Sequence, residues 1–197
     1  AVSKTKPASD ILAAYRAGQR AFGENYLQDA LPKIQALRDT DIEWHFIGRI
    51  QSNKTAEISR YFHWVHGLDR LKHAERLSRQ RPERLPALQV CIQVNLSGEA
   101  SKGGVAPQDL AALATAVARM PRLRLRGLMT MPDTDASTRI QRETFAALRR
   151  LLDELRADGL ELDTLSMGMS DDLTEAVQEG ATIVRIGTAL FGTRPSA

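Results

Sequence analysis

Two kinds of hydrophobic spacing alternate along this chain of 197 residues. Short apolar runs such as "LQVCIQVNL" are typical of buried strands. Each is followed by a longer segment with apolar positions three or four residues apart, which is typical of amphipathic helices. Eight runs of the first kind predict eight strands: "AVSK", "AFGEN", "IEWHFIG", "HWVHGLD", "LQVCIQVNL", "LRLRGLMTM", "DTLSMG" and "TIVRIG".

The segments between these runs predict helices. After the first strand, "PASDILAAYRAGQR" predicts a helix with Ser9 or Asp10 as its N-cap. The other predicted helices cover about residues 26–37, 52–60, 70–78, 107–120, 136–157 and 171–178.

Strands that alternate with helices predict an α/β fold with a parallel sheet, and eight such units can close into a (β/α)8 TIM barrel. We expect one domain over residues 1–197. A doubly wound open sheet is the alternative, but it would need a glycine-rich phosphate turn after its first strand. The stretch "SKTKPAS" contains no glycine, so the dinucleotide fingerprint is absent.

Composition narrows the class of function. A hydrophobic content of 43% allows one substantial core, and Trp44 and Trp64 are expected to pack in it or at the barrel rim. The formal net charge of +3 reflects a small excess of basic side chains and no basic block. Arg79, Arg81 and Arg84 are expected to form a solvated face, so no nucleic-acid partner is predicted.

Cysteine and histidine usage excludes further classes. Cys91, the single cysteine, lies inside an apolar run, so we expect a buried thiol, no internal disulfide and a cytoplasmic protein. No apolar stretch approaches the roughly 18 residues of a membrane span, and no signal-peptide pattern opens the chain. His63, His66 and His73 lack metal-ligand spacing, so no metal site is predicted.

The ends of the predicted strands are polar, and a barrel of this kind forms its working site at these C-terminal ends. Lys4 ends the first strand and Asn25 ends the second. His45 flanks the end of the third, and Met129 lies at the end of the sixth.

The last two strand ends favour an anion. "GMSDDLTEA" predicts a turn that runs into a helix with Ser170 at the N-cap, where unpaired backbone N–H groups face outward. The alternative is that Ser170 only caps its helix. In "IGTALFG", Gly187 allows a ligand to approach the backbone closely. Together these stretches favour a phosphate.

Two cations complete the pattern. Arg185 interrupts an otherwise apolar strand and must meet an acceptor, either a buried acid such as Glu24 or a ligand in the barrel mouth. Lys4 shares a face with Val2 and is expected to project into the same mouth. An amine beside another cation has a lowered pKa, and its neutral form attacks aldehydes. Lysine, arginine and a phosphate cradle together suit pyridoxal 5′-phosphate (PLP).

Six motifs in order resemble the pyridoxal phosphate homeostasis proteins, also called proline synthetase co-transcribed proteins: "AVSKTKP", "FGENY", "EWHFIGRIQSNK", "LRLRGLMTM", "LSMGMSDD" and "VRIGTALFG". The resemblance implies a single-domain barrel similar to the N-terminal domain of alanine racemase, with PLP on a lysine and no established reaction. Members normally begin with a helix and half a strand before this lysine, so we expect that segment to be missing here.

The resemblance also implies roles for individual residues. Lys4 would carry PLP, and Arg185 would face the pyridine nitrogen. Asn25 would line the site, and Met129 and His45 would contact the ring. The residues expected to hold the phosphate are Ser170, Gly187 and Thr188.

A carrier is favoured over an enzyme. Arginine at the pyridine nitrogen keeps it unprotonated, which weakens the electron sink that most PLP chemistry needs. A racemase, the alternative, needs a second base, which alanine racemase takes from a tyrosine in a second domain. Tyr15, Tyr26 and Tyr61 all fall in predicted helices. We therefore predict a monomer without enzymatic activity that holds PLP as a lysine aldimine (a Schiff base) and stores it or delivers it to apo-enzymes.

Overall fold

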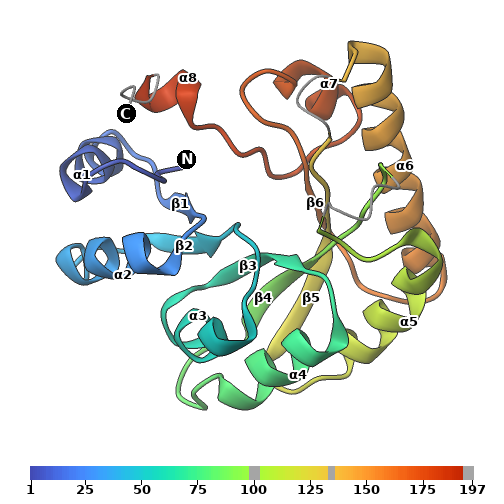
Figure 1. Cartoon of the computed structure of the whole chain (residues 1–197), viewed down its shortest axis with the longest axis horizontal. Coiled ribbons are helices and arrows are strands. Elements are labelled where there is room, and N and C mark those ends of the chain that lie inside the picture. Colours follow the sequence, from blue (N-terminus) through green and yellow to red (C-terminus); the bar gives the residue numbers. More distant parts are fainter. Residues whose placement is uncertain (98–102, 133–135, 193–197) are drawn as a thin grey trace.

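A curved parallel sheet forms the centre of the molecule (Figure 1), in a computed structural model that describes residues 1–97, 103–132 and 136–192. Its six strands lie in the order of the sequence, and each pairs with the next along the chain. They are β1 (Ala21–Glu24), β2 (Glu43–Phe46), β3 (Trp64–Leu68), β4 (Leu88–Gln93), β5 (Leu123–Met129) and β6 (Thr164–Ser166).

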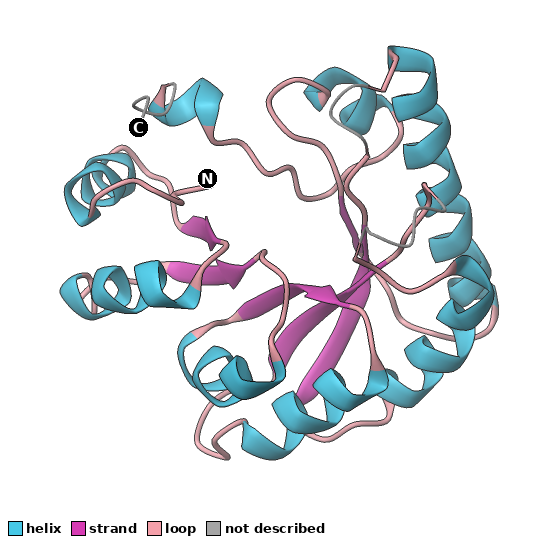
Figure 2. Ribbon diagram, viewed as in Figure 1, coloured by secondary structure: helices cyan, strands magenta, loops and turns pink. Residues whose placement is uncertain are grey.

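Helices form the outer layer around this sheet (Figure 2). Parallel neighbours need a crossover connection, and the amphipathic segments supply it. The helices are α1 (Ala8–Arg16), α2 (Leu27–Ala36), the short 3-10 helix η1 (Ser52–Lys54), α3 (Thr55–Tyr61), α4 (Leu71–Gln80), α5 (Pro107–Ala118), α6 (Thr138–Ala157), α7 (Leu173–Gln178) and α8 (Thr188–Phe191).

The predicted first and eighth strands are present as extended segments, each with a single β-bridge. Val2 bridges to Gly23 of β1, and Ile183 bridges to Ser166 of β6. The two segments meet each other where the Val2 amide donates to the Ile186 carbonyl at 2.7 Å. We call this junction the seam. The expectation of eight strands is thus corrected to six regular strands plus two segments that complete the circle.

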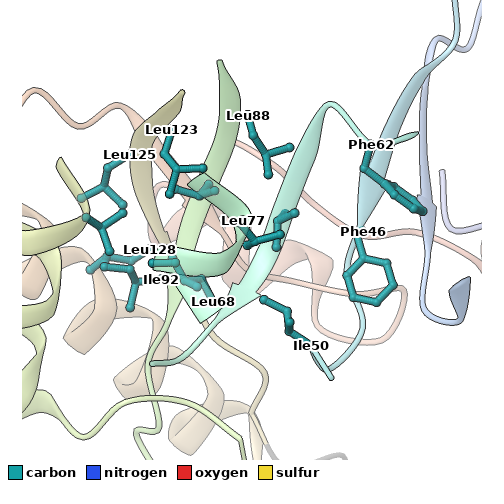
Figure 3. Packing of buried hydrophobic residues seen from close by; sticks show 14 of the residues in the cluster. Phe46, Ile50, Phe62, Leu68, Leu77, Leu88, Ile92, Leu123, Leu125 and Leu128 are labelled. Atoms are coloured by element: carbon teal, nitrogen blue, oxygen red, sulfur yellow. The ribbon is translucent and has the colours of Figure 1, made fainter. Parts of the chain in front are cut away.

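The main core lies between the sheet and the helices (Figure 3). Phe46 of β2 and Phe62 meet edge to face, with ring centroids 5.3 Å apart. A second, smaller cluster fills the inside of the curved sheet, where Trp64, Cys91 and Met129 pack together. The burial predicted for both tryptophans and for Cys91 is confirmed.

Two predicted N-caps are wrong: that of the first helix, and Ser170 for the helix after β6. The first helix begins at Ala8 with Pro7 as N-cap, so neither Ser9 nor Asp10 caps it. The helix expected from residue 171 begins at Leu173, where Asp172 occupies the N-cap position. The Asp172 carboxylate instead accepts a hydrogen bond from the Met169 amide at 2.5 Å, which extends the preceding turn.

The solvated face predicted for the linker arginines is also wrong at one position. Arg81 is only 3% exposed, while Arg79 and Arg84 are exposed. Its guanidinium donates to three carbonyl oxygens, those of Pro86 at 2.9 Å and of Ser59 and Phe62 at 2.7 Å each. These contacts replace the water that an exposed arginine would bind.

Two further observations concern membrane-spanning helices and metal-binding clusters. Among the described helices, none is long and apolar enough to cross a membrane. Within the described ranges there is likewise no group of three or more His, Cys, Asp or Glu side chains that could hold a metal ion.

Candidate functional site at the strand ends

Arg185 lies inside the barrel and is 7% exposed. One terminal nitrogen donates to Ser166 Oγ at 2.9 Å, and the other donates to the Thr130 carbonyl at 3.0 Å. Burial lowers the pKa of Arg185 to about 10, so the guanidinium remains a cation at neutral pH. Both hydrogen-bond partners are neutral, and the charge of the buried Asp172 raises the pKa of Arg185 and so favours the cation.

Glu24 is not the partner of Arg185, which corrects one alternative from the sequence. Its buried carboxylate accepts from Ser3 Oγ at 2.6 Å and from Lys33 Nζ at 2.8 Å. Lys33 also donates to the Ser3 carbonyl at 2.9 Å. The start of the chain is thereby held against β1 and α2.

Lys4 is partly buried and lies in a turn directly after the Val2 bridge. The turn closes through a hydrogen bond from the Lys6 amide to the Ser3 carbonyl at 3.1 Å, and Thr5 within it has a φ of 66°. Lys6 Nζ donates to the Phe191 carbonyl at 2.7 Å. The turn that carries Lys4 therefore touches α8, next to the seam.

Asn25 directly follows β1 and is partly buried. Its Oδ1 atom is buried and has no hydrogen-bond partner among the described residues. Gly48, beyond the end of β2, lies so close that a Cβ there would be 2.0 Å from the Asn25 carbonyl oxygen. The two strand ends are thus in direct contact, and the orphaned amide oxygen is available to a ligand.

Ser170, Gly187 and Thr188, the residues predicted to hold a phosphate, lie at one corner of the candidate site. Ser170 lies two residues before the N-cap of α7, and its Oγ accepts from the Ala189 amide of α8 at 3.5 Å. Gly187 lies against the seam, because a Cβ at this position would be 3.4 Å from Val2 Cβ. Thr188 is the first residue of α8. The loops after the last two segments therefore meet beside the start of the chain.

His45 and Met129 lie deeper inside the barrel than this corner. His45 stacks on Trp64 with centroids 5.4 Å apart, and its Nδ1 lies 2.9 Å from His66 Nε2. Met129 is fully buried against Trp64 and Cys91. A contact between either side chain and a ligand ring stays a prediction.

His66 and Ser166 belong to the surroundings of Arg185, and sequence reasoning assigned them no role. His66 Nδ1 lies 2.7 Å from Ser166 Oγ. The signal was available in the alternation along β3, which places His66 on the same face as Trp64. Burial holds the pKa of His66 well below its usual value, and the positive charge of Arg185 lowers it further.

The chemistry of these groups fits a phosphorylated aldehyde with a basic heteroaromatic ring. An amine at Lys4, an unpartnered oxygen at Asn25 and the corner at Ser170 surround the strand ends. Arg185 adds a buried cation whose guanidinium carries five N–H donors, two of which are accounted for by Ser166 and Thr130. PLP has an aldehyde, a phosphate and a pyridine nitrogen, which these groups complement.

The fold is that of a known class. Residues 1–195 match the family described as "Alanine racemase, N-terminal domain". The chain is 62% identical over 194 residues to the pyridoxal phosphate homeostasis protein of Pseudomonas aeruginosa, covering 98% of this chain and 83% of that protein. It therefore belongs to the pyridoxal phosphate homeostasis family, as its motifs indicated.

Solved structures agree with this assignment. PipY of Synechococcus elongatus PCC7942, determined with PLP bound, is 40% identical, has a TM-score of 0.91 and is covered over 91% of its length by 98% of this chain. Alanine racemase of Corynebacterium glutamicum is 24% identical with a TM-score of 0.72, and the match covers all of this chain and 57% of the racemase. The second likeness extends to the fold alone.

Proposed function

We propose that this protein binds PLP covalently through Lys4 and takes part in PLP homeostasis in the cell, storing the cofactor or delivering it to apo-enzymes. The observation that carries the proposal is Arg185, a buried cation at the strand ends whose hydrogen-bond partners in the described chain are neutral. The family relationship and the PLP-bound structure of PipY support it.

Each group of the site has a distinct task in this proposal. When bound, PLP supplies an aldehyde that links reversibly to an amine and a ring that withdraws electrons. Lys4 provides that amine. Ser170, Gly187 and Thr188 hold the phosphate by hydroxyl and backbone donors. Asn25 accepts a hydrogen bond through its orphaned oxygen.

In this proposal, the effect of Arg185 on the ring nitrogen of PLP is what favours a carrier over an enzyme. A guanidinium with a pKa of about 10 is a hydrogen-bond donor at neutral pH, so it keeps the ring nitrogen of PLP unprotonated. An unprotonated ring withdraws electrons weakly, which disfavours turnover of amino acids. We therefore infer binding without catalysis.

The test of binding compares two neighbouring lysines. Purified protein incubated with PLP should become yellow, and borohydride should fix a pyridoxyl group that mass spectrometry locates on Lys4. Lys4→Arg should abolish the adduct while Lys6→Arg, the matched control, should retain it. A fixed adduct on Lys6, or an undiminished adduct in Lys4→Arg, would contradict the assignment.

The racemase alternative has a separate test. The PLP-loaded protein is incubated with single amino-acid enantiomers in deuterated water. We expect no α-deuterium incorporation, together with transfer of PLP to an added apo-enzyme. Racemisation with deuterium incorporation would overturn the carrier and favour the enzyme.

A further inference from the structure

A continuous row of hydrogen bonds crosses the inside of the barrel. It begins at Arg185, whose terminal nitrogen donates to Ser166 Oγ at 2.9 Å. Ser166 Oγ lies 2.7 Å from His66 Nδ1, and His66 Nε2 lies 2.9 Å from His45 Nδ1. His45 Nε2 lies 2.8 Å from Glu43 Oε1. We call these five residues the interior chain.

The interior chain joins the two rims of the barrel. Glu43 is the first residue of β2, so it lies at the N-terminal rim, and its side chain is 48% exposed. Arg185 is buried and bonded to the carbonyl of Thr130, which follows the end of β5. A half-exposed carboxylate at one rim is thus connected to the buried cation of the candidate site at the other.

The two ends of the interior chain determine its direction. A guanidinium can only donate, and an ionised carboxylate can only accept. Ser166 Oγ accepts from Arg185, which leaves its own proton for His66 Nδ1. His66 then carries its single proton on Nε2 and donates to His45.

The same reasoning extends to the other end. His45 accepts at Nδ1 and carries its proton on Nε2, from which it donates to Glu43. Every bond then contains one proton, and both imidazoles are neutral. Burial lowers the pKa of His45 and of His66, in agreement with neutral rings. The bond from His45 lowers the pKa of Glu43, in agreement with an ionised carboxylate.

The opposite direction is unfavourable. If His66 donated from Nδ1 to Ser166, its Nε2 would have to accept from His45 Nδ1. A neutral His45 would then turn an unprotonated Nε2 toward the Glu43 carboxylate, and two acceptors 2.8 Å apart repel each other. Only an additional proton on the buried imidazole of His45 would remove this conflict.

We propose that His45, His66 and Ser166 are positioning residues that fix the plane of the Arg185 guanidinium. They link Arg185 to Glu43 through hydrogen bonds that all donate in the same direction, from the guanidinium toward the carboxylate. Because one N–H on each terminal nitrogen is engaged by the barrel wall, the remaining donors are presented in a defined orientation. The proposal rests on the proposed function for its ligand, since the ring nitrogen of PLP is the acceptor that Arg185 would meet.

The direction of the interior chain is measured first, on the protein without added PLP. Nitrogen NMR of 15N-histidine-labelled protein distinguishes the two neutral imidazole forms. We expect His45 and His66 both to carry the proton on Nε2. Glu43→Gln, at a half-exposed position that should not prevent folding, replaces the acceptor-only end by an amide that can donate or accept. The signals of both histidines should then change together, whereas those of His73 should not.

The effect on the site is measured second, with PLP carrying 15N in its ring. Ser166→Ala breaks the link between His66 and Arg185. We expect PLP affinity to fall about tenfold, the equivalent of one hydrogen bond to a charged group, and the ring-nitrogen signal to shift. Glu43→Gln should shift the signal in the same direction by less. His73→Gln, a buried histidine outside the interior chain, is the matched control and should change neither.

The outcomes separate this inference from the proposed function. A proton on Nδ1 of His66 would overturn the direction. Unchanged PLP affinity and an unchanged ring-nitrogen signal in both Ser166→Ala and Glu43→Gln would overturn the positioning role. If the unaltered protein failed to bind PLP, the proposed function would fail, and with it the role at the ring nitrogen, while the histidine signals would still report the direction.

Discussion

Arg81 and Arg185 show how differently one residue type can be used in a single barrel. Arg81 lies in the outer layer and donates to the carbonyls of Ser59, Phe62 and Pro86. Arg185 lies inside the barrel and donates to a hydroxyl and to one carbonyl. Both have a pKa lowered by burial. The first ties loops together, while the second presents its charge to the strand ends.

Replacement of Arg81 tests the first use. Arg81→Met keeps much of the apolar stem but removes the donor to three carbonyl groups, of which those of Ser59 and Phe62 accept their bonds in buried surroundings. We expect the free energy of unfolding to fall by about 2–4 kcal/mol, measured by urea denaturation. Arg79→Met, at an exposed position of α4, the helix that ends just before Arg81, should change it by less than about 0.5 kcal/mol. Equal losses in the two variants would contradict the structural role of Arg81.

The buried histidine at the centre of the interior chain predicts a pH dependence. Burial holds the pKa of His66 well below the usual 6.5. As the pH falls below about 6.5, the unfolded chain binds a proton at this residue while the folded protein does not. The contribution of neutral His66 to the free energy of unfolding is therefore fully present above this pH. It is lost as the pH falls, by up to about 1.4 kcal/mol per pH unit for one proton.

Denaturation of the PLP-free protein between pH 7 and pH 5 measures this slope. The His66→Gln variant should be less stable at neutral pH because the interior chain is broken, but its stability should decline more slowly with acid. An identical slope in the parent and the variant would show that His66 does not titrate differently on folding.

At the scale of elements, close backbone contacts determine which strands can pair. Gly127 of β5 is paired with Thr164 of β6. A Cβ at Gly127 would lie 1.8 Å from the Thr164 carbonyl oxygen. The pairing of β5 with β6, which places Ser166 beside Arg185, therefore requires a glycine at position 127 of β5.

Gly127→Ala should force β5 and β6 apart. We expect a loss of more than about 3 kcal/mol in the free energy of unfolding, or no folded protein at all. Gly159→Ala is the control, because Gly159 has a φ of 91° but a Cβ there would have no atom of the described residues within 4 Å, so only about 1 kcal/mol of local strain is expected. Similar stability of the two variants would refute the close contact.

Elements were largely predictable because their hydrophobic periods are strong. The predicted helix over residues 136–157 is α6, which begins two residues later. The errors lie where a local signal competes with a neighbouring contact. Ser170 has the side chain of an N-cap, yet α7 begins beyond it because Asp172 binds the Met169 amide. Arg81 comes directly after the polar helix α4, so the sequence predicts an exposed side chain. The three carbonyl oxygens around it are apparent only from the folded structure.

The candidate site was predictable in part for a similar reason. Alternation along the last predicted strand separates Arg185 from its neighbours and indicates that it needs a buried acceptor. The identity of that acceptor depends on β6 and on the residue after β5, which lie side by side because β5 pairs with β6, and on the bridge that places the last segment beside β6. Glu24 was a chemically reasonable partner, but Lys33 from the adjacent helix reaches it first.

At the scale of the whole molecule, the seam is the weakest part of the circle of segments. Six strands form a continuous ladder, whereas the first and last segments each contribute a single bridge. Lys4 belongs to one side of the seam, and Ser170, Gly187 and Thr188 belong to the other. A ligand that contacts both sides would connect them.

Hydrogen exchange should detect that connection. In the PLP-free protein we expect residues 1–6 and 183–190 to exchange faster than β4, because they have fewer ladder bonds. Saturating PLP at about 100 times its Kd should stabilise the folded state by about 2.7 kcal/mol and protect both segments together. Lys4→Arg should show little protection of either. Protection confined to one segment would argue against a ligand that bridges the seam.

Thr5, next to Lys4, is exposed and has a φ of 66°, a conformation that β-branched residues rarely adopt. Such a residue stores about 1–3 kcal/mol of strain, and asparagine tolerates the same conformation with less. Thr5→Asn, a substitution at an exposed position, should therefore relieve this strain and raise the melting temperature of the protein. If the Thr5→Asn variant also released PLP more slowly, a gain in protein stability at this one surface position would be accompanied by slower release of the cofactor.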